Sequence, residues 1–360
     1  MDILPKFIDT CKGDLPMKFG TAGVFALALL LVGCGAQPQP APAEPISIPD
    51  PHTYAIISKE QSNPYMQNMA DGFAAACQEL GAGAVCVGPD SYTAQAQIDI
   101  IDELIGQKVD AIVIAANDSD ELQDALQRAM DEGIAVLSLD SAVNKESRML
   151  HIQQADPEKI GRVLIQAACK MVEGEGKAAI LSATRQATNQ NLWIEWMQRE
   201  VEQNPSVYAN FELLPVAYGD DESEKSREET LRLLAENPDL KVIICPSVVG
   251  MLAVGQTLEE EGSPVLFTGL GLPSEIAPYI ESGSCPWMYL WNPIDLGYLS
   301  AYATDGLVTG KITGKEGDNL IAGRLGLRVV VDAQDGGTEL LLGDPVKFDP
   351  DNIGEWKSVY

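Results

Sequence analysis

The sequence is poor in the residues that build metal sites and bind polyanions. It has only two histidines, His52 and His151, which are far apart and have no companion in an H-x-x-H or C-x-x-C spacing. Its 24 Lys and Arg residues are outnumbered by 53 Asp and Glu residues, which gives a formal net charge of −29. Zinc needs clustered Cys or His ligands, and nucleic acid attracts cationic surfaces. We therefore predict no metal site and no nucleic-acid partner.

Motifs for common cofactors and nucleophiles are also absent from the sequence. There is no G-x-x-x-x-G-K-[ST] loop, no G-x-G-x-x-G fingerprint and no G-x-S-x-G elbow. We therefore predict no cofactor and no enzymatic activity. Two alternatives stay open. Asp118 and Asp140 could act as the carboxylate pair of a glycosidase, and Cys77 could pair with Cys86 in an oxidising compartment.

The long apolar run near the N-terminus is too short to span a bilayer. It reads MKFGTAGVFALALLLVGC from Met17, with a basic residue first, an apolar centre and small residues last. This order is typical of a secretory signal, whereas a spanning helix needs about 20 apolar residues. We predict that residues 1–33 are a signal peptide, with Met17 as an alternative start.

A cysteine and a proline-rich stretch follow this run. The quartet LVGC ending at Cys34 resembles the bacterial lipobox, which implies that Cys34 is acylated and becomes the first mature residue. An ordinary cleaved signal, in which Cys34 has no role, is the alternative. Residues 34–51 are rich in Pro, Ala and Gln and predict an extended spacer. We expect an extracytoplasmic protein, lipid-anchored to the outer face of the cell membrane or in the periplasm.

The remaining residues, 52–360, predict an α/β fold with two doubly wound parallel-sheet lobes. Single cores stop growing near about 250 to 300 residues, so this length suits two lobes. Apolar runs of strand length alternate with helix-period segments, which predicts βαβ units and parallel sheets covered on both faces. The expected strands are 53–59, 84–89, 111–116, 135–140, 177–184, 212–219, 241–247 and 265–271. The expected helices are one beginning at Pro64 and those over 93–107, 119–132, 189–203, 222–236 and 248–261.

Polar side chains follow the expected strands of both lobes. In open parallel sheets the ligand binds in the crevice outside the carboxyl ends of the strands, and Lys59, Asp140 and Asn189 stand at such ends. Carboxylates accept hydrogen bonds and amides both accept and donate them, which suits the hydroxyl groups of a neutral sugar. Helix capping and turn geometry are alternative explanations for single positions such as Asp118 and Pro246.

Aromatic side chains complete the predicted binding surface. The following lie near expected strand ends or early helical turns: Tyr65, Trp193, Trp196, Trp287, Tyr289 and Trp291. Trp193 and Trp196 are three positions apart on an expected helix, so we expect at least one of them in the core. Trp291 directly follows an expected strand and is predicted to line the cleft.

Several stretches carry a family resemblance. Almost the whole mature chain resembles the type I periplasmic sugar-binding proteins, the ribose-binding superfamily of receptors for ABC importers. Four stretches are similar to its rhamnose-binding branch, whose close relatives include the autoinducer-2 receptor: ATNQNLWIEWM (187–197), VAYGDD (216–221), LWNPIDLGYLSAYA (290–303) and GKITGKEGD (310–318).

The resemblance implies ligand contacts at Lys59, Asp140, Asn189 with Gln190, and the segment from Pro246 to Val248. The autoinducer-2 receptor has an acid where this chain has Asn189, and an amide removes a charge and changes the preferred hydroxyl pattern. This difference favours rhamnose over autoinducer-2 and leaves other deoxysugars or pentoses open. The predicted ligand-binding residues are Lys59, Tyr65, Asp118, Asp140, Asn189, Gln190, Pro246, Val248, Leu270 and Trp291.

The resemblance also implies a division into lobes and a mode of action. The first lobe would hold residues 52–154 and about 286–310, the second 155–285 and about 311–360, joined by three hinge segments. A sugar would close the hinge of a monomer, and the transmembrane subunits of an ABC permease would recognise the closed form. A receptor for a sensor kinase is an alternative. A sugar-responsive transcriptional regulator would need a helix-turn-helix where this chain has a signal and spacer.

Overall fold

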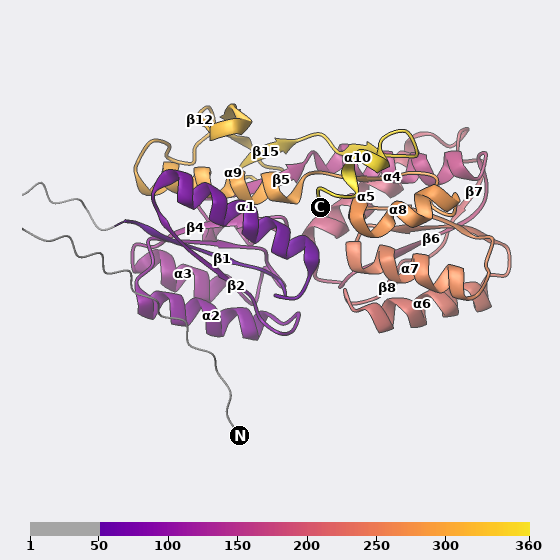
Figure 1. The fold of residues 1–360 in the computed structure, drawn as a ribbon, viewed down its shortest axis with the longest axis horizontal. Helices are drawn as coiled ribbons and strands as arrows, with labels where there is room; N and C mark the ends of the chain where they lie inside the picture. Colours follow the sequence, from indigo (N-terminus) through magenta and orange to yellow (C-terminus); the bar gives the residue numbers. More distant parts are fainter. Residues whose placement is uncertain (1–50) are drawn as a thin grey trace, which may run out of the picture. The chain divides into compact units, whose positions relative to one another are not determined.

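The computed structural model describes residues 51–360. The predicted signal peptide, Cys34 and nearly all of the spacer lie outside these residues, so the statements about them stay predictions. Within the described range the chain folds into two large, mainly parallel β-sheets flanked by helices (Figure 1), with two small two-stranded sheets beside them. No helix of this range is both long and apolar enough to cross a membrane.

The first lobe is built on a seven-stranded sheet with the order β14-β15-β5-β4-β3-β1-β2. Its strands pair in parallel except for β14 with β15, which is antiparallel. The strands are β1 (Thr53–Ile57), β2 (Gly83–Val87), β3 (Ala111–Ile114), β4 (Ala135–Leu139), β5 (Leu150–Ala155), β14 (Val331–Asp332) and β15 (Thr338–Gly343).

The side chains of β1 point alternately to the two faces of the sheet and show why both faces are covered. Tyr54 and Ile56 pack in one apolar cluster with α1 (Pro64–Leu80) and α9 (Pro293–Val308). Ala55 and Ile57 pack in another with α2 (Ala94–Gln107) and α3 (Gln123–Asp131). Because successive side chains of a strand point to opposite faces, a strand that is apolar at every position needs helices on both sides.

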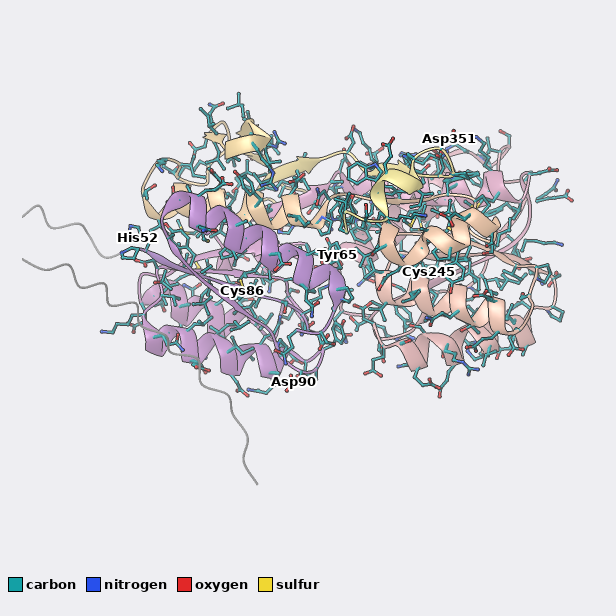
Figure 2. The ribbon with its side chains drawn as sticks, in the orientation of Figure 1. His52, Tyr65, Cys86, Asp90, Cys245 and Asp351 are labelled. Carbon is teal, nitrogen blue, oxygen red and sulfur yellow. The ribbon has the colours of Figure 1, made fainter. Side chains whose placement is uncertain are left out.

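Helices α1 and α9 lie side by side because glycines allow their backbones to touch (Figure 1). A Cβ atom added at Gly72 of α1 would collide with the carbonyl oxygen of Ile294, and one added at Gly297 of α9 would collide with that of Met69. This contact fixes the two helices against each other, and Tyr65 stands in the first turn of α1. Figure 2 places Tyr65 at the end of α1 nearer the second sheet.

The second lobe is built on a five-stranded parallel sheet with the order β10-β9-β6-β7, in which β8 also pairs with β6. Figure 1 shows α4 and α5 on one face of this sheet and α6 and α7 on the other. Its strands are β6 (Glu175–Ser182), β7 (Asn210–Leu213), β8 (Ala217–Tyr218), β9 (Leu240–Cys245) and β10 (Leu266–Gly269). Its helices are α4 (Pro157–Met171), α5 (Thr188–Gln203), α6 (Ser223–Glu236), α7 (Val248–Glu260) and α8 (Pro273–Ser282).

The expected strand over 212–219 is wrong as a single element. The chain forms β7 and then β8, with Pro215 in the gap between them. Proline has no N–H to donate to a sheet, so it breaks a strand that is paired inside a lobe.

Strand pairing differs from the expected division of the chain between lobes. We assigned 311–360 to the second lobe, yet β15 pairs in parallel with β5 of the first sheet, so that assignment is wrong for β14 and β15. We assigned 286–310 to the first lobe. Its helix α9 does pack there. The strand β11 (Met288–Leu290) instead lies with the second lobe. It pairs with β16 (Val346–Phe348), and a bridge between Leu270 and Tyr289 places it beside β10. The chain therefore changes lobe near 155–157, 290–293 and 343–346.

Short elements complete the described part of the chain. They are the strands β12 (Asn319–Ile321) and β13 (Leu327–Val329), the 3-10 turns Lys145–Ser147 and Gly323–Leu325, and the helix α10 (Ile353–Trp356).

Candidate ligand-binding site

Nine of the ten predicted ligand-binding residues line one cavity, to which both sheets contribute residues at the carboxyl ends of their strands. Its volume is about 40 Å³, several times the roughly 10 to 15 Å³ that one water molecule needs. The nine are Lys59, Tyr65, Asp140, Asn189, Gln190, Pro246, Val248, Leu270 and Trp291. The cavity therefore lies where an open α/β sheet binds its ligand.

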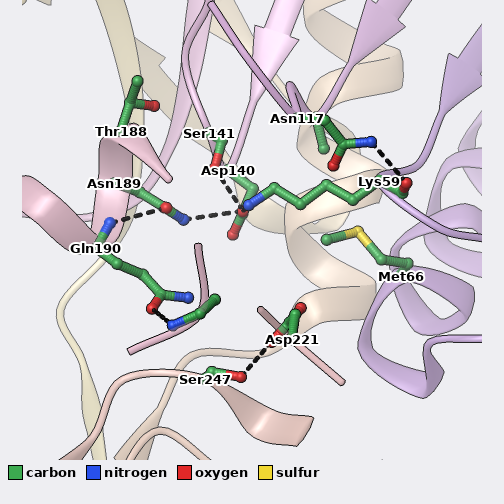
Figure 3. A network of polar contacts seen from close by, with 12 residues as sticks. Lys59, Met66, Asn117, Asp140, Ser141, Thr188, Asn189, Gln190, Asp221 and Ser247 are labelled. Atoms are coloured by element: carbon green, nitrogen blue, oxygen red, sulfur yellow. Dashed lines mark hydrogen bonds and ion pairs between the residues drawn. The ribbon is translucent and has the colours of Figure 1, made fainter. Parts of the chain in front are cut away.

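Asp140, which follows β4, is the centre of the polar wall (Figure 3). Its carboxylate accepts hydrogen bonds from Asn189 Nδ2 at 2.9 Å and Tyr65 Oη at 3.1 Å, and it lies 3.5 Å from Lys59 Nζ. Only 4% of Asp140 is exposed, so these partners replace the water that an ionised carboxylate has lost. Lys59 and Tyr65 come from the first lobe and Asn189 from the second, so Asp140 joins the two lobes.

Backbone geometry marks two carboxylates of the cavity. Asp140 has φ of 58° and Asp221, after β8, has φ of 59°. Side chains other than glycine rarely adopt this left-handed region, and where they do the surrounding structure must hold them there. Each lobe thus holds one strained aspartate at the cavity.

The charges of the cavity argue against an anionic ligand. Lys59 is buried and its ammonium group lies closest to Asp140. Burial raises the pKa of the Asp221 carboxyl above its ordinary value, while the Ser247 hydroxyl and the Lys59 charge act in the opposite direction. Lys59 is the only basic residue that lines the cavity, and it already lies beside Asp140, so a further negative charge would lack a partner.

Three aromatic rings form the opposite wall. Trp291 donates from Nε1 to Tyr65 Oη at 2.7 Å, and its ring lies 5.8 Å from that of Trp193. Loss of solvent raises the pKa of the Tyr65 hydroxyl, and the nearby Asp140 charge raises it further, so Tyr65 stays protonated. The buried indole nitrogen of Trp193 has no hydrogen-bond partner among the described residues. A buried donor of this kind normally has a partner, and a ligand oxygen can supply one.

The second lobe contributes an amide and a helix start. Gln190 Oε1 accepts from Ser182 Oγ at 2.7 Å and from the Ala183 N–H at 2.9 Å, which leaves its NH₂ group to donate to a ligand. Pro246 and Val248 flank Ser247, whose hydroxyl caps α7 by accepting from the Gly250 N–H at 3.1 Å. The cavity is therefore polar on the Asp140 and Gln190 side and apolar on the tryptophan side.

Asp118 is the predicted residue that the structure does not bring to the cavity. Its Oδ1 accepts from the N–H groups of Asp120 at 2.9 Å and Glu121 at 3.1 Å. Such bonds hold a turn. The alternative considered for this position was a helix cap, but the residue at the N-cap of α3 is Leu122. Asp118 and Asp140 consequently do not face one ligand, as a glycosidase pair would.

Three other aromatic candidates also lie outside the cavity: Trp196, Trp287 and Tyr289. Trp287 lies beneath the ammonium groups of Lys170 and Lys347, at 5.6 Å and 4.9 Å from its ring centre. Trp196 lies beneath the guanidinium groups of Arg162 and Arg199. Strand-end position alone did not separate these tryptophans from those that line the cavity.

Sequence reasoning missed four residues that line the cavity: Asn63, Met66, Asp221 and Leu290. Asp221 carried a usable signal, because it ends the VAYGDD stretch that follows a strand. Asn63 also carried one, since an Asn before Pro64 marks a helix start.

Residues 51–360 contain neither a candidate metal site nor a disulfide bond. Residues 51–360 hold no group of three or more His, Cys, Asp or Glu side chains placed to bind a metal ion. Cys77 and Cys86 are both free, so they do not form the disulfide that was left open.

Known proteins share this fold. The model of a periplasmic binding protein domain matches residues 54–312. An ABC transporter solute-binding protein from Clostridium phytofermentas, solved with bound L-rhamnose, is 44% identical. That match covers 86% of this chain and 99% of the other, with a TM-score of 0.83.

Two more distant relatives complete the comparison. LsrB from Clostridium saccharobutylicum, solved in complex with AI-2, is 21% identical over 84% of this chain and 99% of its own, with a TM-score of 0.78, which shows the fold alone. A D-ribose/D-allose-binding protein from Pseudomonas aeruginosa is 24% identical over 204 residues, 54% of this chain and 62% of that protein's length. The family match and the structural similarity confirm the predicted fold class. The matched relatives are sugar-binding transporter proteins, which confirms the prediction that the chain is not an enzyme.

Proposed function

This chain belongs to the periplasmic binding protein family as a solute-binding protein of sugar ABC transporters, and we propose that its ligand is L-rhamnose, held in the cavity around Asp140. The observation that carries the proposal is the buried Asp140 carboxylate, which Lys59 and Tyr65 of the first lobe and Asn189 of the second lobe surround. A relative that is 44% identical holds L-rhamnose. A ligand hydroxyl that donates to Asp140 would enter this network between the lobes.

The two walls of the cavity suit a deoxysugar. Hydroxyl groups can bond to Asp140, Asn189 and Gln190, which together offer both acceptors and donors. A methyl group and the C–H face of the sugar can pack against Trp291 and Leu290 on the apolar side. The charge balance of the cavity disfavours sugar acids and sugar phosphates.

Closure follows from contacts that one ligand makes with both lobes. A sugar bound to Asp140 and Gln190 would stabilise the closed form by its higher affinity for that form. The ABC permease would then recognise the closed surface. An acylated Cys34 and the spacer over 34–51 would keep the monomer close to that permease and raise its effective concentration there.

Isothermal titration calorimetry on purified residues 46–360, unfolded and refolded to remove carried ligand, tests the assignment. The panel is L-rhamnose, ribose, xylose, galactose, glucose, and autoinducer-2 with and without borate. We expect sub-micromolar binding of L-rhamnose that Asp140→Ala and Asn189→Ala remove. Asp118→Ala, which changes a carboxylate outside the cavity, is the matched control and should bind normally. A stronger response to autoinducer-2 or to a pentose would replace rhamnose as the ligand.

A further inference from the structure

A second cavity adjoins the sugar cavity across the contact between Asp140 and Asn189. Its volume is about 260 Å³, against about 40 Å³ for the sugar cavity. Ligand pockets usually have volumes of about 300 to 1,000 Å³, so the sugar cavity alone is small. Asp140 and Asn189 line both cavities. Figure 3 shows Thr188, which lines the second cavity, on one side of their contact and Gln190, which lines the sugar cavity, on the other.

The floor of the second cavity is a polar stretch of the first sheet. His151 and Gln153 of β5 and Glu339 of β15 line it. They share one face of the sheet, because His151 and Gln153 are two positions apart and Glu339 is the register partner of His151. On β4 the same face is apolar at Val136, which packs with α2 and α3. Over the polar stretch, loop residues line the cavity instead of these helices: 142–144 and 333–335.

Apart from the shared Asp140, the charges of the second cavity nearly cancel. Arg148 Nη2 pairs with Asp335 Oδ2 at 2.7 Å. Burial lowers the pKa of His151 to about 4, so its ring is uncharged at neutral pH. Burial first, and then the Asp335 charge, raise the pKa of the Glu339 carboxyl to about 7. A neutral ligand with hydroxyl groups therefore suits this cavity better than an ion does.

Both lobes contribute side chains that can bind hydroxyl groups in the second cavity. The NH₂ group of Asn144 donates to Asp120 Oδ1 at 3.0 Å and to Gln123 Oε1 at 2.8 Å, which leaves its Oδ1 as an acceptor. Thr188 of the second lobe donates from Oγ1 to the Ala142 carbonyl at 3.3 Å, and its oxygen can still accept. The second cavity is therefore bounded by both lobes, as the sugar cavity is.

We propose that the second cavity is a subsite for a further sugar unit, so that the receptor takes a rhamnoside of two linked sugars. This inference rests on the proposed sugar-binding function and names its ligand class. One linked ligand fits better than two separate sugars, because Asp140 and Asn189 line both cavities. Pro157 and Leu192 of the second lobe line the second cavity but not the first, so a second unit adds contacts between ligand and both lobes.

Isothermal titration calorimetry on residues 46–360 tests the subsite with L-rhamnose and with the α-linked isomers of rhamnobiose, which contains two L-rhamnose units. We expect one isomer to bind about tenfold more tightly than L-rhamnose, equivalent to about 1.4 kcal/mol, with one molecule per chain. Leu192→Trp should fill the second cavity and remove this advantage. Glu339→Ala should reduce it, because a hydrogen-bonding carboxyl is lost. Glu212→Ala, which changes an exposed glutamate of β7, is the matched control and should keep the advantage.

L-Rhamnose itself separates failure of the subsite from failure of the proposed function. Each variant should bind L-rhamnose as the unmodified protein does, which also shows that the variant folds. Normal L-rhamnose binding, with no rhamnobiose bound more tightly, would overturn the subsite and keep the proposed function. Two molecules of L-rhamnose per chain would overturn the linked ligand, since the cavities would then act as independent sites.

The two remaining outcomes concern the ligand of the sugar cavity. Binding of rhamnobiose but not of L-rhamnose, weakened in both Leu192→Trp and Glu339→Ala, would overturn the monosaccharide as the ligand and support the subsite. No response to either sugar by the unmodified protein would overturn the subsite and the proposed function together.

Discussion

At the scale of single residues, the site depends on a carboxylate that the fold has removed from water. Asp140 is 4% exposed, and its carboxylate contacts partners from three parts of the chain. Removing one partner of a buried ion pair leaves the other charge uncompensated, which costs far more than the pair contributes. Lys59 therefore supports the folded state as well as the ligand.

We predict that Lys59→Met lowers the free energy of unfolding by about 3 kcal/mol and abolishes rhamnose binding, because Asp140 loses its cation. Urea denaturation followed by circular dichroism measures the loss. Lys357→Met is the control: Lys357 pairs with Glu281 at 2.7 Å on the surface, where such a pair is worth less than about 1 kcal/mol. Equal losses in the two variants would contradict a buried ion pair at the site.

The residue scale also shows what the sequence could predict of the site. Polar residues after parallel strands converge at one edge, so Lys59, Asp140 and Asn189 were found from position alone. Asp118 follows a strand equally well, but its side chain turns back onto its own loop. A carboxylate that holds its own turn and a ligand-binding carboxylate look alike in a sequence, since their difference lies in the direction of one side chain.

At the scale of elements, the contact between α1 and α9 positions two aromatic side chains of the cavity. Tyr65 stands in the first turn of α1, and Trp291 precedes α9 by two residues. Because backbone touches backbone at Gly72 and Gly297, no larger side chain fits without moving one helix along the other. The bond between Trp291 and Tyr65 depends on that spacing.

Gly297→Ala should lower the free energy of unfolding by about 1 to 3 kcal/mol through overpacking and weaken rhamnose binding. Gly106→Ala in α2 is the control, because nothing lies near its added Cβ. There the higher helix propensity of alanine should stabilise the protein by up to about 1 kcal/mol. Thermal unfolding of both variants checks the opposite signs, and a shift in the same direction would contradict the close packing of α1 on α9.

Helices and strands could be predicted where the sequence pattern that indicates them lies within the element itself. The sequence pattern predicted the start of α1, and it predicted α2, α7 and β1 to within two residues at each end. It did not place β15 in the first sheet, because its pairing with β5 joins residues that are far apart in the chain. Pairing between strands so far apart in the chain depends on how the whole chain folds. A short window of sequence does not contain that information.

At the scale of the whole molecule, an acidic receptor is proposed to stay near its importer through Cys34. A net charge of −29 would disfavour self-association, and the spacer predicted over 34–51 would separate the folded part from the anchor. The anchor lies outside the described residues and needs its own test.

Replacing Cys34 with Ser should release the mature protein from the cell membrane, because the thiol that carries the acyl chain is lost. Labelling cells with an alkyne palmitate and separating membrane from supernatant measures both lipid and location. Cys86→Ser changes an exposed cysteine of the folded part and should leave the protein in the membrane fraction. Unchanged lipid labelling in Cys34→Ser would contradict acylation at this residue.

The most direct test of the central claim is a crystal structure of residues 46–360 grown with L-rhamnose. The account predicts one sugar in the cavity, with a hydroxyl group on Asp140 from the first lobe and another on Asn189 or Gln190 from the second, and its methyl group toward Trp291. A sugar that contacts one lobe alone, or that binds away from Asp140, would contradict the account.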